Sequence, residues 1–240
     1  MSIIQVLTSA DARLGEVQKL LAHIKKLEDM AEKEKDPVSA ENATILRGLF
    51  FVHLYGAFEN SIALSVQVLL QEITKVGVSY SHFEHLLHAV ALDPDFRSVA
   101  DAGWQSKWLK RRELLQKQLS HTSCALNDTL FHDQIENVWY ATLSNIFEYL
   151  CIPVPAVPDN RMRGYIDEIV NNRNAVAHGR LSPQTVGRLT TSAELAKRLD
   201  AITEVINHVV TSFDSYLTNR EFVAIPHRPH YVSPTAVDPA

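Results

Sequence analysis

The sequence predicts an all-α protein, and three observations support this. Glycine is scarce, with 8 residues in 240, whereas residues that favour helices are plentiful. Apolar residues recur at steps of three and four residues along most of the chain, which is the period of an amphipathic helix. Hydrophobic residues make up 46% of the chain and charged residues 21%, which is enough to form a globular core. We expect one helical domain over residues 1–220 and a flexible, Pro-rich tail over 221–240.

Two helices are expected at the start of the chain. The first covers residues 12–35 and stops before Pro37, because proline cannot continue a helix. Ser39 is the predicted cap of the second, which runs over 39–75 as one long helix or as two stacked ones. Apolar residues cover two of its faces, and this pattern is typical of a central, buried helix.

Three polar or charged side chains interrupt this central helix, namely Arg47, Tyr55 and Glu59. A buried carboxylate requires a partner, because desolvation of an unpaired charge is costly. Arg173 is our first candidate partner for Glu59, and Arg47 is the alternative. A third reading places Glu59 on the helix surface with no particular partner.

Residues 77–118 are expected to form a helical insertion. A short helix over Val78–Ala91 should end at Pro94. Its predicted inward residues are Phe83, Leu86, Leu87 and Val90.

The second half of the insertion, from Phe96 to Leu119, is predicted as helix with some loop. It contains Trp104 and Trp108 among four basic residues, Lys107, Lys110, Arg111 and Arg112. The favoured interpretation is an ordinary amphipathic helix whose tryptophans belong to the core. The alternative is a surface that binds single-stranded nucleic acid through stacking and charge.

The next helix is predicted over residues 133–151, followed by a rigid connector with three prolines. Asp159 or Asn160 can cap the helix after it, and Gly179 stands where a C-terminal glycine would end that helix. The inward residues of the 133–151 helix are predicted to be Val138, Leu143, Ile146, Phe147 and Leu150. A last amphipathic helix, capped by Ser192, is expected over 193–219.

The most informative stretch is the end of the helix before Gly179, which carries Arg173, Asn174 and His178. Arg suits phosphate, because it is permanently charged and binds two oxygens at once. His titrates near neutral pH and suits proton transfer. Arg173 and His178 lie about 140° apart around the helix axis, so one helix cannot pair them closely. A second helix or a second chain must complete any site.

The run Arg173-Asn174-Ala175-Val176-Ala177-His178-Gly179 resembles the signature of the HEPN superfamily, in which Arg and a polar residue precede His. The earlier pattern Arg47-x7-Tyr55-x2-Phe58-Glu59 resembles one bacterial branch, the MAE and RiboL-PSP type. The resemblance implies a HEPN-like helical bundle, here with an insertion at 77–118. It also implies a twofold homodimer whose motif helices meet at the seam.

Many members of the superfamily are metal-independent ribonucleases, often toxins or anti-phage effectors. The resemblance therefore implies an endoribonuclease with Arg173, His178 and Asn174 as catalytic residues, supported by Glu59 and Arg47, and with no cofactor or metal. Arg161, Arg163 and Arg180 are predicted RNA contacts, or else plain surface charges. The expected partners are RNA, a second copy of the chain and a cognate antitoxin. The alternative is a non-catalytic HEPN-like module that binds RNA or a protein.

Charge and composition limit these expectations. The formal net charge is −5, so RNA must be bound by a local basic patch rather than by the chain as a whole. Cys124 and Cys151 show no metal or disulfide spacing, which fits a reducing cytoplasm. We expect no signal peptide and no membrane span, because no uncharged apolar run reaches about 18 residues.

Overall fold

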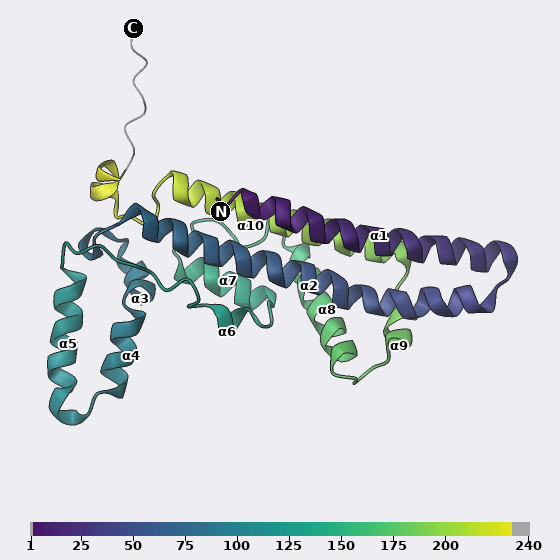
Figure 1. Cartoon of the computed structure of the whole chain (residues 1–240), viewed down its shortest axis with the longest axis horizontal. Coiled ribbons are helices and arrows are strands. Elements are labelled where there is room, and N and C mark those ends of the chain that lie inside the picture. The colour runs from purple at the N-terminus through teal and green to yellow at the C-terminus, as the bar shows by residue number, and fades with distance from the viewer. Residues whose placement is uncertain (1, 232–240) are drawn as a thin grey trace, which may run out of the picture.

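The computed structural model describes residues 2–231, and this part of the chain consists of helices joined by turns and loops (Figure 1). Two long helices, α1 (Gln5–Glu34) and α2 (Pro37–Val76), lie antiparallel along the length of the molecule. The last long helix, α10 (Ser192–Thr218), packs against both of them, and α8 (Arg161–Ala177) packs on α2 and α10. The prediction of an all-α bundle is confirmed.

The residue that caps the second helix differs from the predicted one. Asp36, not Ser39, caps α2, because its carboxylate accepts hydrogen bonds from the backbone N–H groups of Val38 (3.0 Å) and Ser39 (3.2 Å). Pro37 occupies the first helical turn, where its missing N–H has no cost. Helix α1 also begins at Gln5 rather than near residue 12, since buried side chains continue its apolar stripe towards the N-terminus.

Helix α2 is a single, uninterrupted helix and the centre of the core. It packs against α1, α8, α9 and α10. By length and composition alone α2 is apolar enough to cross a membrane, but more than half of its most apolar window is buried inside the bundle. Burial against the neighbouring helices accounts for its apolar faces.

The first half of the insertion is less regular than predicted. It comprises the 3₁₀ turns Tyr80–His82 and His85–Leu87, followed by α3 (His88–Ala91). Phe83, Leu87 and Val90 are buried as predicted, whereas Leu86 is exposed. The 3₁₀ geometry changes the helical period, so that Leu86 no longer faces inward.

The second half forms a hairpin of α4 (Asp93–Asp101) and α5 (Trp104–Gln118), which projects from one end of the bundle (Figure 1). The helix before Pro94 ends at Ala91 as predicted, and Pro94 itself lies in the first turn of α4. The prediction that the two tryptophans belong to the core is wrong: Trp104 is 83% exposed and Trp108 is 74% exposed. Helix α5 packs mainly on α4 and the turn at Tyr80–His82, and its outer face is exposed within residues 2–231.

The predicted helix over 133–151 consists of α6 (His132–Ile135) and α7 (Tyr140–Tyr149), with a break between them. The break follows from a tertiary contact, because the backbone N–H of Val138 donates to the hydroxyl of Tyr55 (3.0 Å). All the predicted inward residues are buried, namely Val138, Leu143, Ile146, Phe147 and Leu150.

A short helix, α9 (Pro183–Gly187), connects α8 to α10 and packs against α2. Thr191, rather than Ser192, caps α10: its hydroxyl accepts from the N–H of Glu194 (3.2 Å), and the Glu194 carboxylate accepts from the N–H of Thr191 (2.8 Å). This reciprocal pair is a capping box, which shifts the helix start by one residue.

The predicted tail begins later than expected, because residues 221–231 pack on the bundle. Phe222 and Val223 are fully buried, and the Glu84 N–H donates to the carbonyl of Phe222 (2.9 Å). A 3₁₀ helix, Ile225–His230, follows, and the Tyr231 hydroxyl lies 2.8 Å from Nδ1 of His82. The rest of the predicted tail, 232–240, lies outside the described residues.

Candidate active site

Helix α8 ends as the sequence predicts. His178 is its C-cap residue, and Gly179 adopts the left-handed conformation (φ 67°) that a side chain would disfavour. The N–H of Leu181 then donates to the carbonyl of Ala175 (3.0 Å), which folds the chain back on the helix end. The His178 ring is exposed, and within residues 2–231 it forms no hydrogen bond or ion pair. It is therefore accessible to a ligand.

Arg173 is held in place from two sides. Its guanidinium carbon lies 4.5 Å from the centre of the Tyr55 ring, a cation–π contact, and its Nη1 donates to Oδ1 of Asn174 (2.8 Å). Asn174 in turn donates through Nδ2 to Oδ1 of Asn137 (3.4 Å), in the break between α6 and α7. Asn174 thus orients Arg173, and among residues 2–231 its side chain forms no hydrogen bond with the His178 ring. The other N–H groups of the guanidinium have no partner among the described residues and face no competing carboxylate.

Tyr55 connects α2 to this arrangement. Its hydroxyl donates to Oε1 of Glu59 (2.9 Å) and accepts from the N–H of Val138 (3.0 Å). The carbonyl of Glu136 lies 3.3 Å from the same hydroxyl. Burial raises the pKa of Tyr55 well above its usual value, and the nearby Glu59 carboxylate raises it further. The phenol therefore stays neutral and keeps its proton for Glu59.

The expected ion pair between Glu59 and Arg173 is absent from the described part of the chain, and the alternative pair with Arg47 is absent too. Tyr55 separates Glu59 from Arg173, with its ring against the cation and its hydroxyl on the carboxylate. Arg47 instead pairs with Glu28 (2.6 Å) and donates to the carbonyl of Gly187 (2.9 Å). It therefore ties α1, α2 and α9 together and does not support the site directly.

The three other arginines near the motif have different surroundings. Arg161 pairs with Asp159 (2.6 Å) at the start of α8, and Arg163 lies over the ring of Tyr140 (4.7 Å). Arg180 is exposed directly after Gly179. Arg180 is therefore the one of the three that stands next to His178, whereas Arg161 is already neutralised by a carboxylate.

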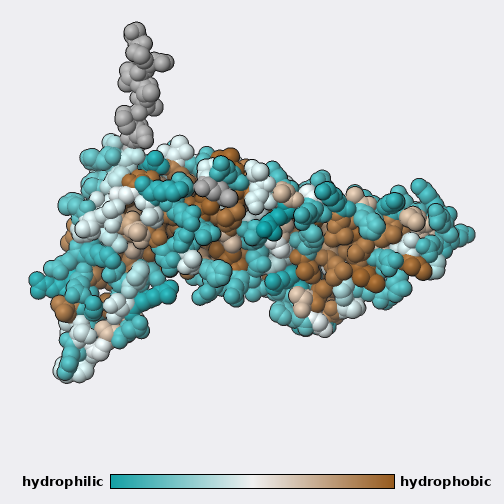
Figure 2. Space-filling view, viewed as in Figure 1, coloured by the Kyte–Doolittle hydropathy of each residue, from teal (hydrophilic) through white to brown (hydrophobic). Residues whose placement is uncertain are grey.

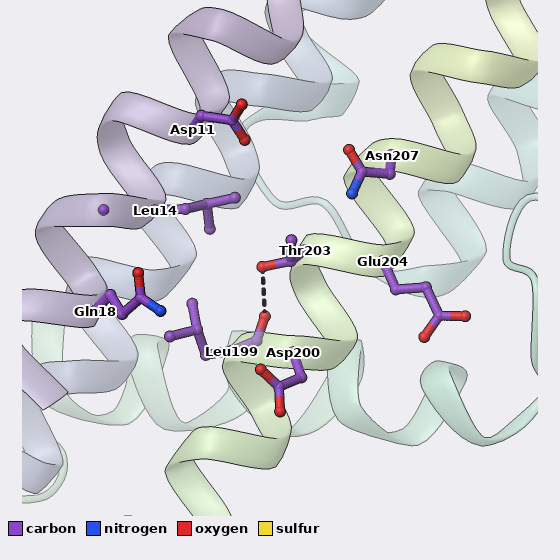
Figure 3. Close-up of a pocket in the computed structure, with 9 residues that line it drawn as sticks. Asp11, Leu14, Gln18, Leu199, Asp200, Thr203, Glu204 and Asn207 are labelled. Carbon is purple, nitrogen blue, oxygen red and sulfur yellow. Dashed lines mark hydrogen bonds between the residues drawn. The ribbon is translucent and has the colours of Figure 1, made fainter.

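A hollow of about 500 Å³ lies elsewhere, between α1 and α10 (Figure 3). Three carboxylates line it, those of Asp11, Asp200 and Glu204, and no Lys or Arg does. The hydroxyl of Thr203 donates a hydrogen bond to the carbonyl of Leu199 (2.8 Å). A phosphate would be repelled there, so the end of α8, with half-buried Arg173 and exposed His178, is the better candidate for polyanion chemistry.

A family model described as HEPN_MAE_28990-like HEPN matches residues 5–222. The chain belongs to this HEPN family. No significant match was found among curated proteins or solved structures. The matched range begins with α1 and ends where Phe222 packs on the bundle, so the HEPN unit includes the α4–α5 hairpin.

Two contacts of this candidate site were not predicted from the sequence. Asn137 holds Asn174, but it lies in an irregular segment, where no periodicity marks it. Tyr55 was visible as a polar residue in an apolar helix, yet its role as a platform for Arg173 depends on how α2 crosses α8. No group of three or more His, Cys, Asp or Glu residues able to hold a metal occurs in residues 2–231.

The Tyr55 hydroxyl should contribute measurably to the stability of the HEPN bundle. In Tyr55→Phe the N–H of Val138 and the carboxylate of Glu59 lose a buried partner, which should cost about 1–2 kcal/mol of unfolding free energy. Urea denaturation followed by circular dichroism would measure this. The matched control is Tyr149→Phe, at an exposed position of α7, expected to change stability by less than about 0.5 kcal/mol. Equal effects of both changes would contradict the hydrogen-bond account.

Proposed function

We propose that this HEPN protein is a metal-independent endoribonuclease whose catalytic groups are Arg173 and His178, assisted by Asn174. The observation that carries the proposal is that the Arg173 side chain is held in a fixed orientation. Its guanidinium is stacked on Tyr55 and fixed by Asn174, yet no carboxylate neutralises it. An oriented arginine without a carboxylate partner, on the helix whose end carries an exposed histidine, suits the binding of a phosphate group.

RNA supplies its own nucleophile, the 2′-hydroxyl. In the proposed reaction one His178 imidazole accepts the 2′-hydroxyl proton while the 2′-oxygen attacks the adjacent phosphorus. The bond from phosphorus to the 5′-oxygen breaks, and a second His178, protonated at the start, donates a proton to that oxygen. Arg173 stabilises the extra negative charge on the phosphoryl oxygens. The products are a 2′,3′-cyclic phosphate and a 5′-hydroxyl.

The need for two histidines leads us to propose a twofold homodimer with the ends of α8 at its seam. Three exposed leucines on α2 and around α9 support this, since Leu49 is 39%, Leu181 41% and Leu189 77% exposed. Figure 2 shows hydrophobic residues gathered over the part of α2 next to α9. Burying such a patch against a second copy would favour association.

We further propose that the enzyme is a toxin or an anti-phage effector. A nuclease that needs no cofactor is active as soon as it folds, so a cell that makes it requires a means of restraint. A cognate antitoxin that covers the Arg173–His178 region would provide one. The competing proposal is a non-catalytic HEPN module that binds RNA or protein.

The deciding experiment is RNA cleavage in the presence of EDTA, with single-stranded and structured RNAs as substrates. The wild type should cut RNA, and His178→Ala should cut at least about 100-fold more slowly, because proton transfer contributes about 10²–10⁴-fold. The control is His23→Ala, an exposed histidine on α1 outside the site, which should retain wild-type activity.

End-group analysis completes the test. Fragments should accept phosphate at their 5′ ends without prior phosphatase treatment and should carry cyclic phosphates at their 3′ ends. Cleavage that EDTA abolishes, or that survives in His178→Ala, would show that the proposed site is wrong. A folded protein that cuts none of the RNAs would favour the non-catalytic module.

A further inference from the structure

Helix α5 presents an unusual surface to the solvent. Trp104, Trp108, Leu115 and Leu119 are 83%, 74%, 58% and 74% exposed. They recur at steps of three and four residues with Arg111 and Arg112, so all six lie along one side of the helix. We call this side the α5 face.

The opposite side of α5 is attached to the rest of the hairpin. Leu114 is buried there, and Lys117 pairs with Asp95 of α4 (2.7 Å) and lies over the ring of Tyr80 (5.0 Å). The exposure of the α5 face is therefore not the result of a loosely attached helix. The fold holds the helix by one side and leaves two tryptophans on the other.

The charge of α5 is opposite to that of the chain. The helix contains five basic residues and one carboxylate, a formal charge of +4, in a chain whose formal net charge is −5. Lys110 pairs with Glu113 (3.1 Å), whereas Arg111 and Arg112 form no ion pair in the described part of the chain. This combination of free positive charge and exposed aromatic rings fits a single-stranded polyanion with stackable bases.

We propose that the α5 face is a second RNA-contact surface, which binds a single-stranded stretch of the substrate outside the cleavage site. The proposal rests on the proposed function, because it takes RNA to be the substrate. Trp104 and Trp108 lie one helical turn, about 6 Å, apart along the axis, so that each can stack with a base. The guanidinium carbon of Arg111 lies 4.8 Å from the centre of the Trp108 ring, a cation–π contact. This places the positive charge of Arg111 where it can contact the phosphates of a strand stacked on the tryptophans.

Other occupants fit less well. Pairing of α5 with a second copy of itself would bring Arg111 and Arg112 close to like charges. A helix that lies in a membrane surface keeps its cations on the face opposite the apolar one, whereas here the two arginines lie within the apolar stripe. An RNA strand uses the arginines and the tryptophans together.

The test separates stacking from simple hydrophobic contact. The parent protein is the full chain with His178→Ala, which should bind RNA without cutting it. Trp104 and Trp108 are replaced together, by Phe in one variant and by Leu in the other. Leu keeps much of the apolar area but has no aromatic face.

Binding to a fluorescein-labelled single-stranded RNA is measured by fluorescence anisotropy. The Leu variant should raise Kd at least about tenfold, whereas the Phe variant should stay within about threefold. Replacing Arg111 and Arg112 by Gln should reduce the slope of log Kd against log salt by about 1.4. The control is Leu86→Ala, an exposed apolar residue outside the α5 face, which should leave Kd unchanged. All these sites are exposed, so circular dichroism should show unchanged helix content.

Three results would overturn the proposal. The first is that the parent does not bind RNA, and the second is that the Leu and Phe variants bind equally well. The third is that the Leu variant keeps its RNA affinity while losing binding to anionic phosphatidylglycerol vesicles or to a copurified protein. Failure of the proposed function is distinguishable. If the wild type cuts no RNA but binding still depends on the two tryptophans, the nuclease proposal fails and the RNA surface stands. If the wild type cuts RNA and binding ignores the α5 face, only the surface proposal fails.

Discussion

Replacing Arg173 by Lys is expected to lower the rate of RNA cleavage about 100-fold, although the positive charge is retained. Lys cannot stack a planar cation on Tyr55, and its single ammonium group cannot donate to Asn174 and to two phosphate oxygens at fixed angles. Arg173→Ala removes the charge as well and should lose about a further tenfold. Single-turnover cleavage in EDTA would measure both changes as kcat/KM.

The matched control for this series is Arg13→Lys on α1, an exposed arginine outside the site, which should stay within about twofold of the wild type. Thermal unfolding must show that Arg173→Lys remains folded. If Lys at 173 restores wild-type activity, the site needs only a charge, and the stacking on Tyr55 has no catalytic purpose. If Ala at 173 is also active, Arg173 does not contact the reacting phosphate.

Helices and their buried faces could be predicted from the sequence because local periodicity determines them. The end of α8 is an example: the requirement for a left-handed residue after His178 is visible as Gly179. The same holds for the inward residues of α7, which are buried as the apolar period predicts. These features depend on residues close together in the chain.

The features that could not be predicted depend on contacts between distant segments. Tyr55 and Val138 are far apart in sequence, yet their hydrogen bond breaks the helix predicted over 133–151. The position of Tyr55 between Glu59 and Arg173 likewise depends on the crossing of α2 and α8, and charge alone suggested a direct ion pair. In α5 the helical period is as predicted, but the side with the tryptophans faces the solvent and not the core. Apolar spacing does not show whether another helix covers that side.

The packing of α9 on α2 leads to the largest expected effect on stability. The two helices meet at a pair of glycines, Gly48 and Gly187, and a methyl group on Gly48 would overlap the backbone carbonyl of Pro183. The atoms that the methyl group would overlap belong to the backbone of Pro183 and not to a flexible side chain. Gly48→Ala must therefore push the two helices apart. The expected loss is about 3 kcal/mol of unfolding free energy, at the upper end for an overpacked core.

The control for Gly48→Ala is Gly15→Ala. Gly15 also lies inside a long helix, but a methyl group there meets no atom within 4 Å. This change should therefore stabilise the protein by about 0.5–1 kcal/mol through helix propensity. Urea denaturation of both variants at one protein concentration would measure the difference, since the proposed dimer would make stability depend on concentration. Because α9 follows the His178 loop and contacts α8, Gly48→Ala should also reduce cleavage, whereas Gly15→Ala should not. Equal stabilities of the two variants would contradict the close approach of α2 and α9.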